Sequence, residues 1–588
     1  MEMTNGSLIW RMACDGAYAS HDEVSRMLRD LDEIMKYFVF PGERDVLAFS
    51  GQEVSICGQS PIILLDANNP TKVKNRVAAE EHNEWSSLEE IIRDVLAEVS
   101  GVPSASILKS NNIYHLGLDS ISAIKVGSLL RKKDVTIGFR DMLKAGSITE
   151  MAQLVHNAQS SLMAPDSTNN KNGSANGFII PDDVNLSNVL GRADLDEHEI
   201  EEVLPASSMQ VHMLSVWQNT HGDVFYPCFR YTLSGQIDIR TLDRAWNALV
   251  AETPILRTIF VSTNSRSSPI LQVVLRPPTT GQSKLSGEDT TWISRTTDRL
   301  SQPYHLLQAD KQGEKWNLRL DIHHALYDAI SLPAIMERFT SLCGADKPHQ
   351  PHLPAFDWGH VLAPRQTERN TAARRQFWTE YLAGAESPPL SLESGEHNTQ
   401  SRANLVKRSA LSGVPAITGL CRANGVSLQA LFFAAYAQFL AAEAAKRGTG
   451  KPQRVVFGIY LANRAEGSEP GARVYPFLRL VPLRVVLKEG ASLVDLAVEI
   501  QKDIHAISAP VNVEVGLWEV KDWTGITVHS FVNFLGVPSS VRDEKENGVR
   551  LEVVEGLVAD TAVVPNRPHN EDGERLLLML RYQWRAMT

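Results

Sequence analysis

A polar segment at residues 164–177 most constrains how this 588-residue chain can fold. It reads Ala-Pro-Asp-Ser-Thr-Asn-Asn-Lys-Asn-Gly-Ser-Ala-Asn-Gly and offers almost nothing to a hydrophobic core. Such segments behave as flexible linkers, because ordering them costs conformational entropy that no burial offsets. We therefore predict a multidomain protein, in which a linker at residues 163–194 separates a small unit at 80–162 from a large unit at 195–588.

The composition indicates ordinary packed domains and argues against several partners. Hydrophobic residues make up 43% of the chain, which is enough for packed cores. The formal net charge is −11 and the densest basic run is 131–133, so no Lys/Arg block is present to neutralise nucleic-acid phosphates. The five cysteines have no C-x-x-C spacing, so we expect neither a metal site nor a disulfide framework. No signal-peptide pattern opens the chain and no apolar run approaches about 18 residues, so we expect no membrane span and a cytoplasmic location.

The small unit has the hydrophobic period of an all-α bundle of the four-helix type. Residues 88–99 carry apolar side chains at the i, i+3, i+4 and i+7 positions that form one face of a helix. Ser86 and Glu89 have the spacing of a capping box, in which each side chain binds the backbone N–H of the other. Further helices are predicted to begin near Ser120 and at Ser147. A bundle of roughly 80 residues has a modest core but can fold alone.

The large unit mixes the periods of helices and strands. Residues 242–252 have a helical pattern, whereas residues 317–322 alternate like a strand. An apolar helix is predicted at 428–440, and further strands are predicted at 454–460 and 480–487. This alternation indicates layers of helices and strands in an α/β fold.

Residues 1–60 lack a self-contained pattern. Residues 7–10 predict a strand, and Ser20 has the character of an N-cap for a helix with one apolar face. The stretch at 576–582, near the end of the chain, resembles the opening strand. We therefore expect residues 1–60 to be the closing piece of an earlier domain of the large type, and the large unit to stop before its own closing helix.

The motif at residues 116–121, Leu-Gly-Leu-Asp-Ser-Ile, resembles the Leu-Gly-x-Asp-Ser attachment site of acyl and peptidyl carrier proteins. The resemblance implies 4'-phosphopantetheine bound covalently to Ser120 and a phosphopantetheinyl transferase as a partner. A phosphate on a serine at a helix N-terminus meets free backbone N–H groups and the positive end of the helix dipole. Asp119 could orient the serine hydroxyl or a metal ion of the modifying enzyme. The alternative is that Asp119 or Ser120 serves only as an N-cap.

The motif at residues 323–329, His-His-Ala-Leu-Tyr-Asp-Ala, resembles the His-His-x-x-x-Asp-Gly motif of nonribosomal peptide synthetase condensation domains. Further segments similar to that family follow in its order, at residues 206–210, 256–260, 377–382 and 476–484. The resemblance implies two lobes related to chloramphenicol acetyltransferase with a tunnel between them. In that family, two pantetheine arms enter the tunnel from opposite faces, and the acceptor's amine attacks the donor's thioester.

The resemblance also assigns roles to residues of the motif. His324 matches the catalytic position, Asp328 and Arg257 match an ion pair that fixes the loop, and His323 matches a packing or hydrogen-bonding residue. An imidazole with a pKa near 6.5 can accept a proton from an attacking amine, or it can hold the amine and stabilise the transition state. The alternative is that both histidines only stabilise the end of a strand. Neighbours in an extended chain point to opposite faces, so only one of them can face the tunnel.

The chain departs from the family pattern at several positions. Ala329 replaces the motif glycine, and it would strain the loop if that position required a positive φ. Tyr475 stands where glycine is usual and Arg479 where asparagine is common. Either residue could narrow the tunnel or change its charge. Residues 513–516 lack the expected His-Gln or Arg-Asp motif. Residues 518–525 resemble a segment of fungal condensation domains, which favours a fungal synthetase of the hydroxamate siderophore type.

These features predict an acyl-transferring enzyme of nonribosomal peptide synthesis. An acyl or peptidyl thioester carried on Ser120 would be condensed with an acceptor amine to form an amide, with His324 in the active site. The alternatives are an ester-forming or cyclising terminal condensation domain, an epimerisation domain, a non-catalytic docking or recruitment domain, and a truncated gene product. Heterocyclisation is disfavoured because Asp321 and Asp328 lack the Asp-x-x-x-x-Asp spacing.

The chain shows no adenylation signature and no phosphate-binding Gly-rich loop. We therefore expect upstream adenylation and carrier modules to supply the loaded thioester. The acceptor is expected to be another carrier domain or a free amine.

Overall fold

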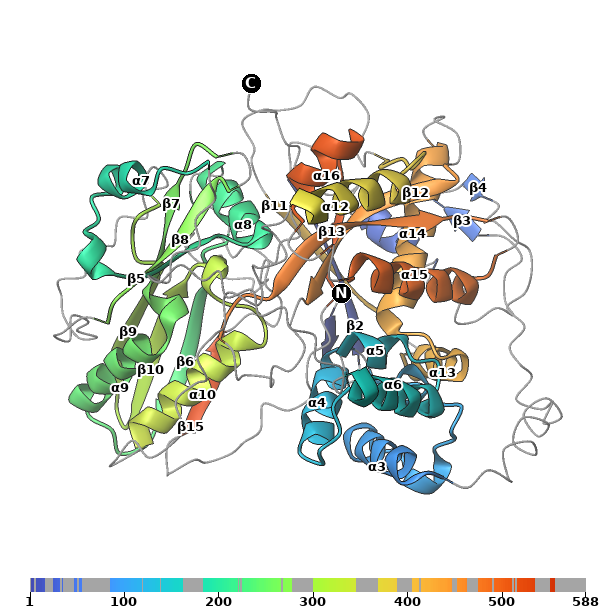
Figure 1. Ribbon diagram of the computed structural model, residues 1–588, viewed down its shortest axis with the longest axis horizontal. Coiled ribbons are helices and arrows are strands. Elements are labelled where there is room, and N and C mark those ends of the chain that lie inside the picture. The colour runs from blue at the N-terminus through green and yellow to red at the C-terminus, as the bar shows by residue number, and fades with distance from the viewer. Residues whose placement is uncertain are drawn as a thin grey trace.

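The computed structural model separates the chain into a small helical unit and two larger lobes (Figure 1). It describes residues 2–4, 7–15, 25–31, 34, 47–49, 52–54, 85–118, 120–137, 139–161, 183–219, 222, 225–265, 268–277, 300–344, 368–388, 404–411, 414–446, 452–462, 474–488, 491–509, 512, 515–534 and 550–555.

The small unit is a helical bundle, as predicted. Its elements are α3 (Ser87–Ser100), η1 (Ser104–Ser106), η2 (Tyr114–Leu116), α4 (Ser120–Arg131), α5 (Phe139–Lys144) and α6 (Ile148–Ser161). The bundle has a core of its own, which includes Ile92, Leu96, Val126 and Met151. The predicted capping box is confirmed, because the Ser86 backbone N–H donates to Glu89 and the Glu89 N–H donates to the Ser86 hydroxyl.

The first lobe contains two antiparallel sheets with helices packed against them (Figure 1). Its elements before residue 258 are α7 (Leu186–Ala193), η3 (Glu197–Glu199), β5 (Ile200–Pro205), α8 (Ser208–Asn219), β6 (Cys228–Ser234), α9 (Ile239–Glu252) and η4 (Pro254–Arg257). They are followed by β7 (Thr258–Ser262), β8 (Ile270–Leu275), β9 (His305–Gln312), β10 (Lys315–Ile322), η5 (His324–Leu326) and α10 (Ser331–Gly344). Strand order is β5-β8-β7 in one sheet and β15-β6-β10-β9 in the other.

The second lobe is built around the three-stranded sheet β13-β12-β14. Its elements are α12 (Glu368–Tyr381), β11 (Asn404–Leu411), α13 (Val414–Asn424), α14 (Leu428–Lys446), β12 (Arg454–Ala462), β13 (Leu478–Val486), α15 (Leu493–Ile507), α16 (Leu517–Thr524) and β14 (Phe531–Val532). By length and composition α14 could cross a membrane, but 83% of its apolar window is buried inside the protein. It therefore has the environment of a core helix.

Two segments of the second half of the chain cross back to the first lobe. Strand β15 (Arg550–Glu555) pairs with β6, more than 300 residues earlier in the sequence. The side chains of Val474, Tyr475 and Phe477 are buried in the core of the first lobe, just before β13 enters the second. We call residues 474–477 the crossover segment. These crossings tie the two lobes together. β15 lies opposite the first half of β10 across β6, and the crossover segment reaches the loop that follows β10.

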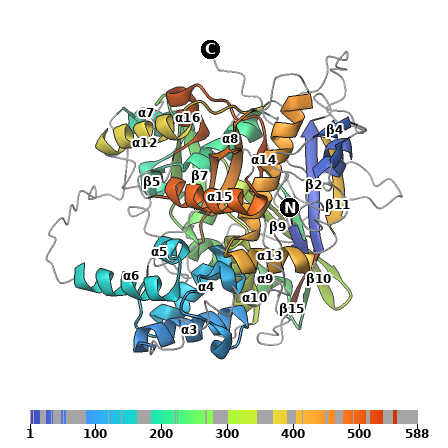
Figure 2. The ribbon, with the colours of Figure 1, turned by 90° about the vertical axis from the view of Figure 1, so that its right-hand side faces the viewer.

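The N-terminal residues lie on the second lobe of this same chain. β1 (Glu2–Thr4) pairs with β2 (Ser7–Asp15), and β2 runs antiparallel beside β11 (Figure 2). A short hairpin of β3 (Leu47–Phe49) and β4 (Gln52–Val54) follows. Side chains from the helical stretch at 25–34 enter the second lobe's core, namely Met27, Leu28, Leu31 and Ile34. That these residues close an earlier domain stays a prediction; in this chain they cover its own second lobe.

The predicted linker is shorter at its C-terminal end than the sequence indicated. Residues 186–193 form α7, which Asn185 caps by accepting from the Asn188 N–H. Val189, Leu190 and Ala193 bury one face of this helix against β5, β7 and β8. The polar residues around this short apolar face obscured it in the sequence.

Candidate active site

The two motif histidines follow β10, and backbone hydrogen bonds fix both of them. The His323 N–H donates to the Tyr304 carbonyl at 2.8 Å, and the His324 N–H donates to the Phe225 carbonyl at 2.8 Å. The chain then turns through η5 and continues into α10. The strand end and the start of the helix therefore hold the motif on both sides.

His323 lies in an aromatic cage within the first lobe. Its ring packs edge-on against Trp217, Tyr226 and Tyr304, with centroid distances of 5.3, 5.5 and 5.3 Å. Its Nδ1 accepts a hydrogen bond from the Ala325 N–H at 3.0 Å. Burial, together with the neighbouring His324, holds the pKa of His323 well below its usual range. This environment keeps His323 neutral and fits the packing role that the sequence suggested rather than proton transfer.

His324 has a hydrogen bond that fixes its tautomer. Its Nδ1 lies 3.0 Å from the carbonyl oxygen of Tyr327, and a carbonyl can only accept, so the neutral ring carries its proton on Nδ1. Nε2 is then the lone-pair nitrogen, which is the form that a proton acceptor requires. The ring stacks on Tyr327 at 4.8 Å and meets the Phe225 ring at 6.1 Å. With only 2% of the residue exposed, its orientation is fixed by packing.

Asp328 supports the loop through backbone groups. Its Oδ1 accepts from the N–H groups of Ile330 and Ser331 at the start of α10, at 3.0 and 2.7 Å. Its Oδ2 accepts from the Phe477 N–H at 3.0 Å, which attaches the crossover segment to the histidine loop. Asp328 therefore connects the motif to the second half of the chain.

The predicted ion pair between Asp328 and Arg257 is wrong. Arg257 instead pairs with Glu201 of β5 at 2.5 Å and donates to the Leu275 carbonyl of β8. It lies where η4 leads into β7, and it joins the strands of that sheet. Arg257 thus supports the first lobe's scaffold and does not clamp the histidine loop directly.

Gln210 of α8 is a supporting residue to which the sequence analysis assigned no role. Its amide donates to the Ala325 carbonyl at 3.1 Å, inside the histidine motif. Its Oε1 accepts from the Ser207 N–H and from the Tyr475 hydroxyl, at 2.9 and 3.0 Å. The Ser-Ser-Met-Gln segment at residues 207–210 was the available signal, because it places Gln210 in one of the family-like segments. The structure shows that this amide is fully buried, so it must be hydrogen-bonded.

The departures from the family pattern have structural explanations. The described residues other than glycine with a positive φ are Asp134, Asp194 and Phe225, so Ala329 causes no backbone strain. Tyr475 is buried in the network with Gln210. Arg479 is buried in the second lobe and donates to the carbonyls of Asn512 and Ile507, at 3.0 and 3.2 Å. These contacts give Tyr475 and Arg479 structural roles in the two lobes.

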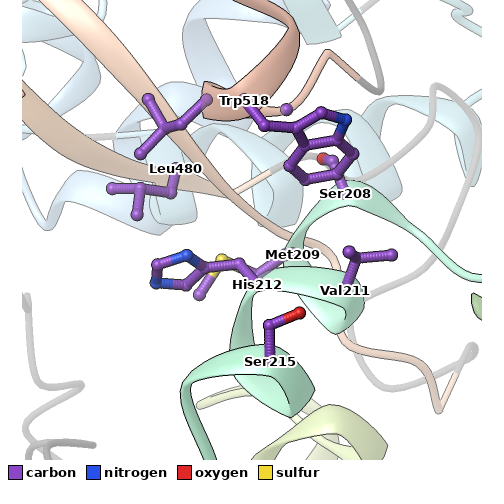
Figure 3. A pocket seen from close by; sticks show the side chains of 9 residues that line it. Ser208, Met209, Val211, His212, Ser215, Leu480 and Trp518 are labelled. Atoms are coloured by element: carbon purple, nitrogen blue, oxygen red, sulfur yellow. The ribbon is translucent and has the colours of Figure 1, made fainter. Parts of the chain in front are cut away.

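A pocket lies between the lobes beside this loop (Figure 3). It is lined by α8, by Leu480 of β13 and by the turn that begins α16, and Trp518 and His212 lie on opposite walls. The His212 ring is 6.1 Å from the Phe225 ring, which in turn contacts His324. Burial lowers the pKa of His212 to about 4, so this wall is uncharged at neutral pH. The Phe225 ring thus links His212 on the pocket wall to His324.

The attachment motif lies on the helical unit at the beginning of α4. Ser120 is the first residue of this helix, and Gly117 ends η2 with φ 73°, a left-handed conformation that favours glycine. A phosphate on Ser120 would lie at a helix N-terminus, where backbone N–H groups are available. These residues therefore fit a 4'-phosphopantetheine group, which supplies a mobile thiol for carrying acyl groups. Asp119 lies outside the described residues.

Together, these sites define an acyl carrier joined to a two-lobed acyl-transfer domain. Residues 200–517 match the family model described as the condensation domain, and residues 90–155 match the phosphopantetheine attachment site. The chain belongs to the condensation-domain family, with the chloramphenicol acetyltransferase-like fold expected from its sequence, and it carries covalent 4'-phosphopantetheine.

Curated relatives support the same assignment. The chain is 38% identical over 571 residues to Nonribosomal peptide synthetase 2 of Gibberella zeae, which covers 96% of this chain and 11% of the relative. It is 34% identical over 545 residues to Nonribosomal peptide synthetase SIDC of Beauveria bassiana, covering 92% and 10%. A solved structure of the first condensation domain of the calcium-dependent antibiotic synthetase aligns with 60% of this chain and 85% of that one, at 16% identity and a TM-score of 0.41. The chain spans about a tenth of the length of the curated relatives it matches.

Proposed function

We propose that this chain is a carrier–condensation unit of a fungal nonribosomal peptide synthetase and that it forms an amide bond. Ser120 carries the acyl or peptidyl thioester, and His324 assists attack by the acceptor amine. The observation that carries this proposal is the hydrogen bond from His324 Nδ1 to the Tyr327 carbonyl, because it leaves Nε2 able to accept a proton.

The proposed chemistry needs little from the protein beyond positioning and one proton acceptor. The amine nitrogen forms the new bond to the thioester carbonyl carbon, the carbon–sulfur bond breaks, and the thiol leaves with a proton. His324 Nε2 can accept the amine's proton or hold the amine in place. Positioning both reactants removes much of the entropic barrier to a bimolecular step.

This chemistry requires several kinds of partner, which we propose by class. A phosphopantetheinyl transferase modifies Ser120, upstream adenylation and carrier modules deliver the loaded group, and a carrier domain or free amine accepts it. One relative, 27% identical over 444 residues, is the hydroxamate-type ferrichrome siderophore peptide synthetase of Schizosaccharomyces pombe. We therefore propose a hydroxamate siderophore peptide as the product class and the cytoplasm as the location.

Intact-protein mass spectrometry of acyl discharge from Ser120 tests this proposal. The full chain is converted to its phosphopantetheine form with an aminoacyl or peptidyl group attached, and then offered free or carrier-bound amines. We expect acceptor-dependent discharge that is lost in His324→Ala and retained in His198→Ala, a histidine variant on the exposed surface. Ser120→Ala controls for the site of loading. Discharge that is equally fast in His324→Ala would overturn the assignment of His324, and a chain that cannot be loaded would overturn the carrier assignment.

A further inference from the structure

The carrier bundle packs on the second lobe through the loop that precedes its attachment serine. The turn η2 contacts α13. Helix α5 contacts α15, and the two lie side by side in Figure 2. The Tyr114 hydroxyl lies 3.5 Å from Nε2 of His505 on α15. Gly425, just after α13, faces the ring of His115, which a Cβ at that position would approach to 2.5 Å. This face of the second lobe is thus a docking surface for the carrier within one chain.

Arg422 of α13 lies directly against the attachment loop. A Cβ built on Gly117 would lie 2.5 Å from Nε and 2.8 Å from Nη2 of Arg422, so only a glycine lets the guanidinium approach this closely. Gly117 is three residues before Ser120, a separation that spans at most about 11 Å of fully extended chain. A fixed positive charge from the second lobe is therefore positioned near the modified serine.

The Arg422 guanidinium has no anionic partner among the described residues. Arg422 is exposed, and it forms no hydrogen bond or ion pair with another described residue. By contrast, Lys502 on the neighbouring helix α15 pairs with Glu499 at 2.8 Å. Arg422 is thus available to an anion that the unmodified chain lacks.

The phosphopantetheine group brings such an anion to Ser120. Its phosphodiester carries one negative charge at neutral pH and presents oxygen acceptors, which a planar guanidinium can bind with two parallel hydrogen bonds. Because the charge is part of the cofactor's attachment, the contact can form only after modification.

We propose that Arg422 binds the phosphate of the phosphopantetheine on Ser120, and that modification thereby strengthens docking of the carrier on the second lobe. Before modification, weaker docking leaves the serine accessible to the transferase. After modification, Arg422 acts as a positioning residue that holds the base of the arm at the condensation unit. This inference rests on the modification of Ser120 in the proposed function and is independent of catalysis by His324.

Hydrogen exchange measured by mass spectrometry on the full chain tests the inference. The unmodified and phosphopantetheine forms are compared for wild type, Arg422→Gln, Arg422→Lys and the matched control Lys502→Gln. In wild type we expect modification to slow exchange of residues 109–118 and 414–426 by roughly two- to fivefold, the scale of an exposed ion pair. Arg422→Gln should remove this difference, Arg422→Lys should keep part of it, and Lys502→Gln should keep all of it.

Two results would overturn the proposal: no effect of modification on exchange in wild type, or the same effect in Arg422→Gln. Intact mass confirms complete modification of each variant before exchange. A chain that cannot be modified would count against the carrier assignment, whereas a modified chain with unchanged exchange would count against Arg422 alone. Raising the ionic strength should reduce the wild-type difference, because exposed charges are screened by salt.

Discussion

The Tyr475 hydroxyl donates to Oε1 of Gln210 at 3.0 Å, and the amide of Gln210 donates to the Ala325 carbonyl within the histidine motif. The crossover segment is therefore connected to the catalytic loop by two hydrogen bonds through a single side chain. The Phe477 N–H adds a second connection, to Asp328. The position of His324 thus depends on a segment about 150 residues later in the sequence.

Tyr475→Phe tests the first connection. The substitution keeps the buried ring and removes only the hydroxyl, so we expect a loss of about 1 kcal/mol in unfolding free energy, measured by urea titration. Tyr475→Gly restores the residue usual in the family but leaves a cavity, and we expect it to cost roughly 3–5 kcal/mol. Equal stability of the glycine variant and wild type would show that the ring does not fill this site.

Double-mutant cycles test the corrected pairing of Arg257. We expect Arg257→Ala and Glu201→Ala to be coupled by up to about 1 kcal/mol, because the pair is partly exposed. Arg257→Ala and Asp328→Ala should be additive within about 0.5 kcal/mol, since the two side chains bind different partners. Asp328→Ala alone should be the more damaging change, because it leaves three backbone N–H groups without their acceptor. Strong coupling between positions 257 and 328 would instead restore the ion pair inferred from the family.

Local patterns predicted much of this structure. The alternation at residues 317–322 predicted β10, and the apolar run at 428–440 predicted α14. An element with one buried face shows a periodic apolar pattern in its sequence, and an element buried on all faces shows a continuous apolar run. Ser120 and His324 could also be identified from the sequence, because the residues of each motif are adjacent in the chain.

Long-range partners could not be predicted from those patterns. The pairing of β15 with β6 and the burial of residues 474–477 in the first lobe depend on how whole elements pack, and no local period records that. The same applies to Arg257, whose partner Glu201 lies 56 residues away on β5. For Arg257, the family-like segment thus identified the residue, while the tertiary fold determined its partner.

The pH dependence of the carrier bundle should reflect Glu89. Burial alone would raise the pKa of this carboxylate, but hydrogen bonds from the Ser86 backbone, Lys109 and Thr149 outweigh it and lower the pKa from 4.5 to about 2. A pKa lowered in the folded state contributes stability above pH 4.5, and this contribution is lost as the pH falls from 4.5 towards 2. We expect Glu89→Gln to cost roughly 1–3 kcal/mol at pH 7 and almost nothing near pH 2. Thermal melts across this range, with the exposed Glu90→Gln as control, measure the difference; a penalty independent of pH would contradict the charge-based explanation.

The N-terminal residues should stabilise the second lobe although their sequence resembles the end of such a unit. Leu31 is 3% exposed in the lobe's core, and Arg26 pairs with Glu443 of α14 at 3.2 Å. We expect Leu31→Ala to destabilise the second lobe by roughly 2–4 kcal/mol, because it removes buried apolar volume. Arg29→Ala, on the exposed side of the same helical stretch, should change stability by less than about 0.5 kcal/mol. Urea titration followed by hydrogen exchange of α14 reports on the lobe directly. Wild-type protection of α14 in Leu31→Ala would mean that the helical stretch at 25–34 does not contribute to this core in solution.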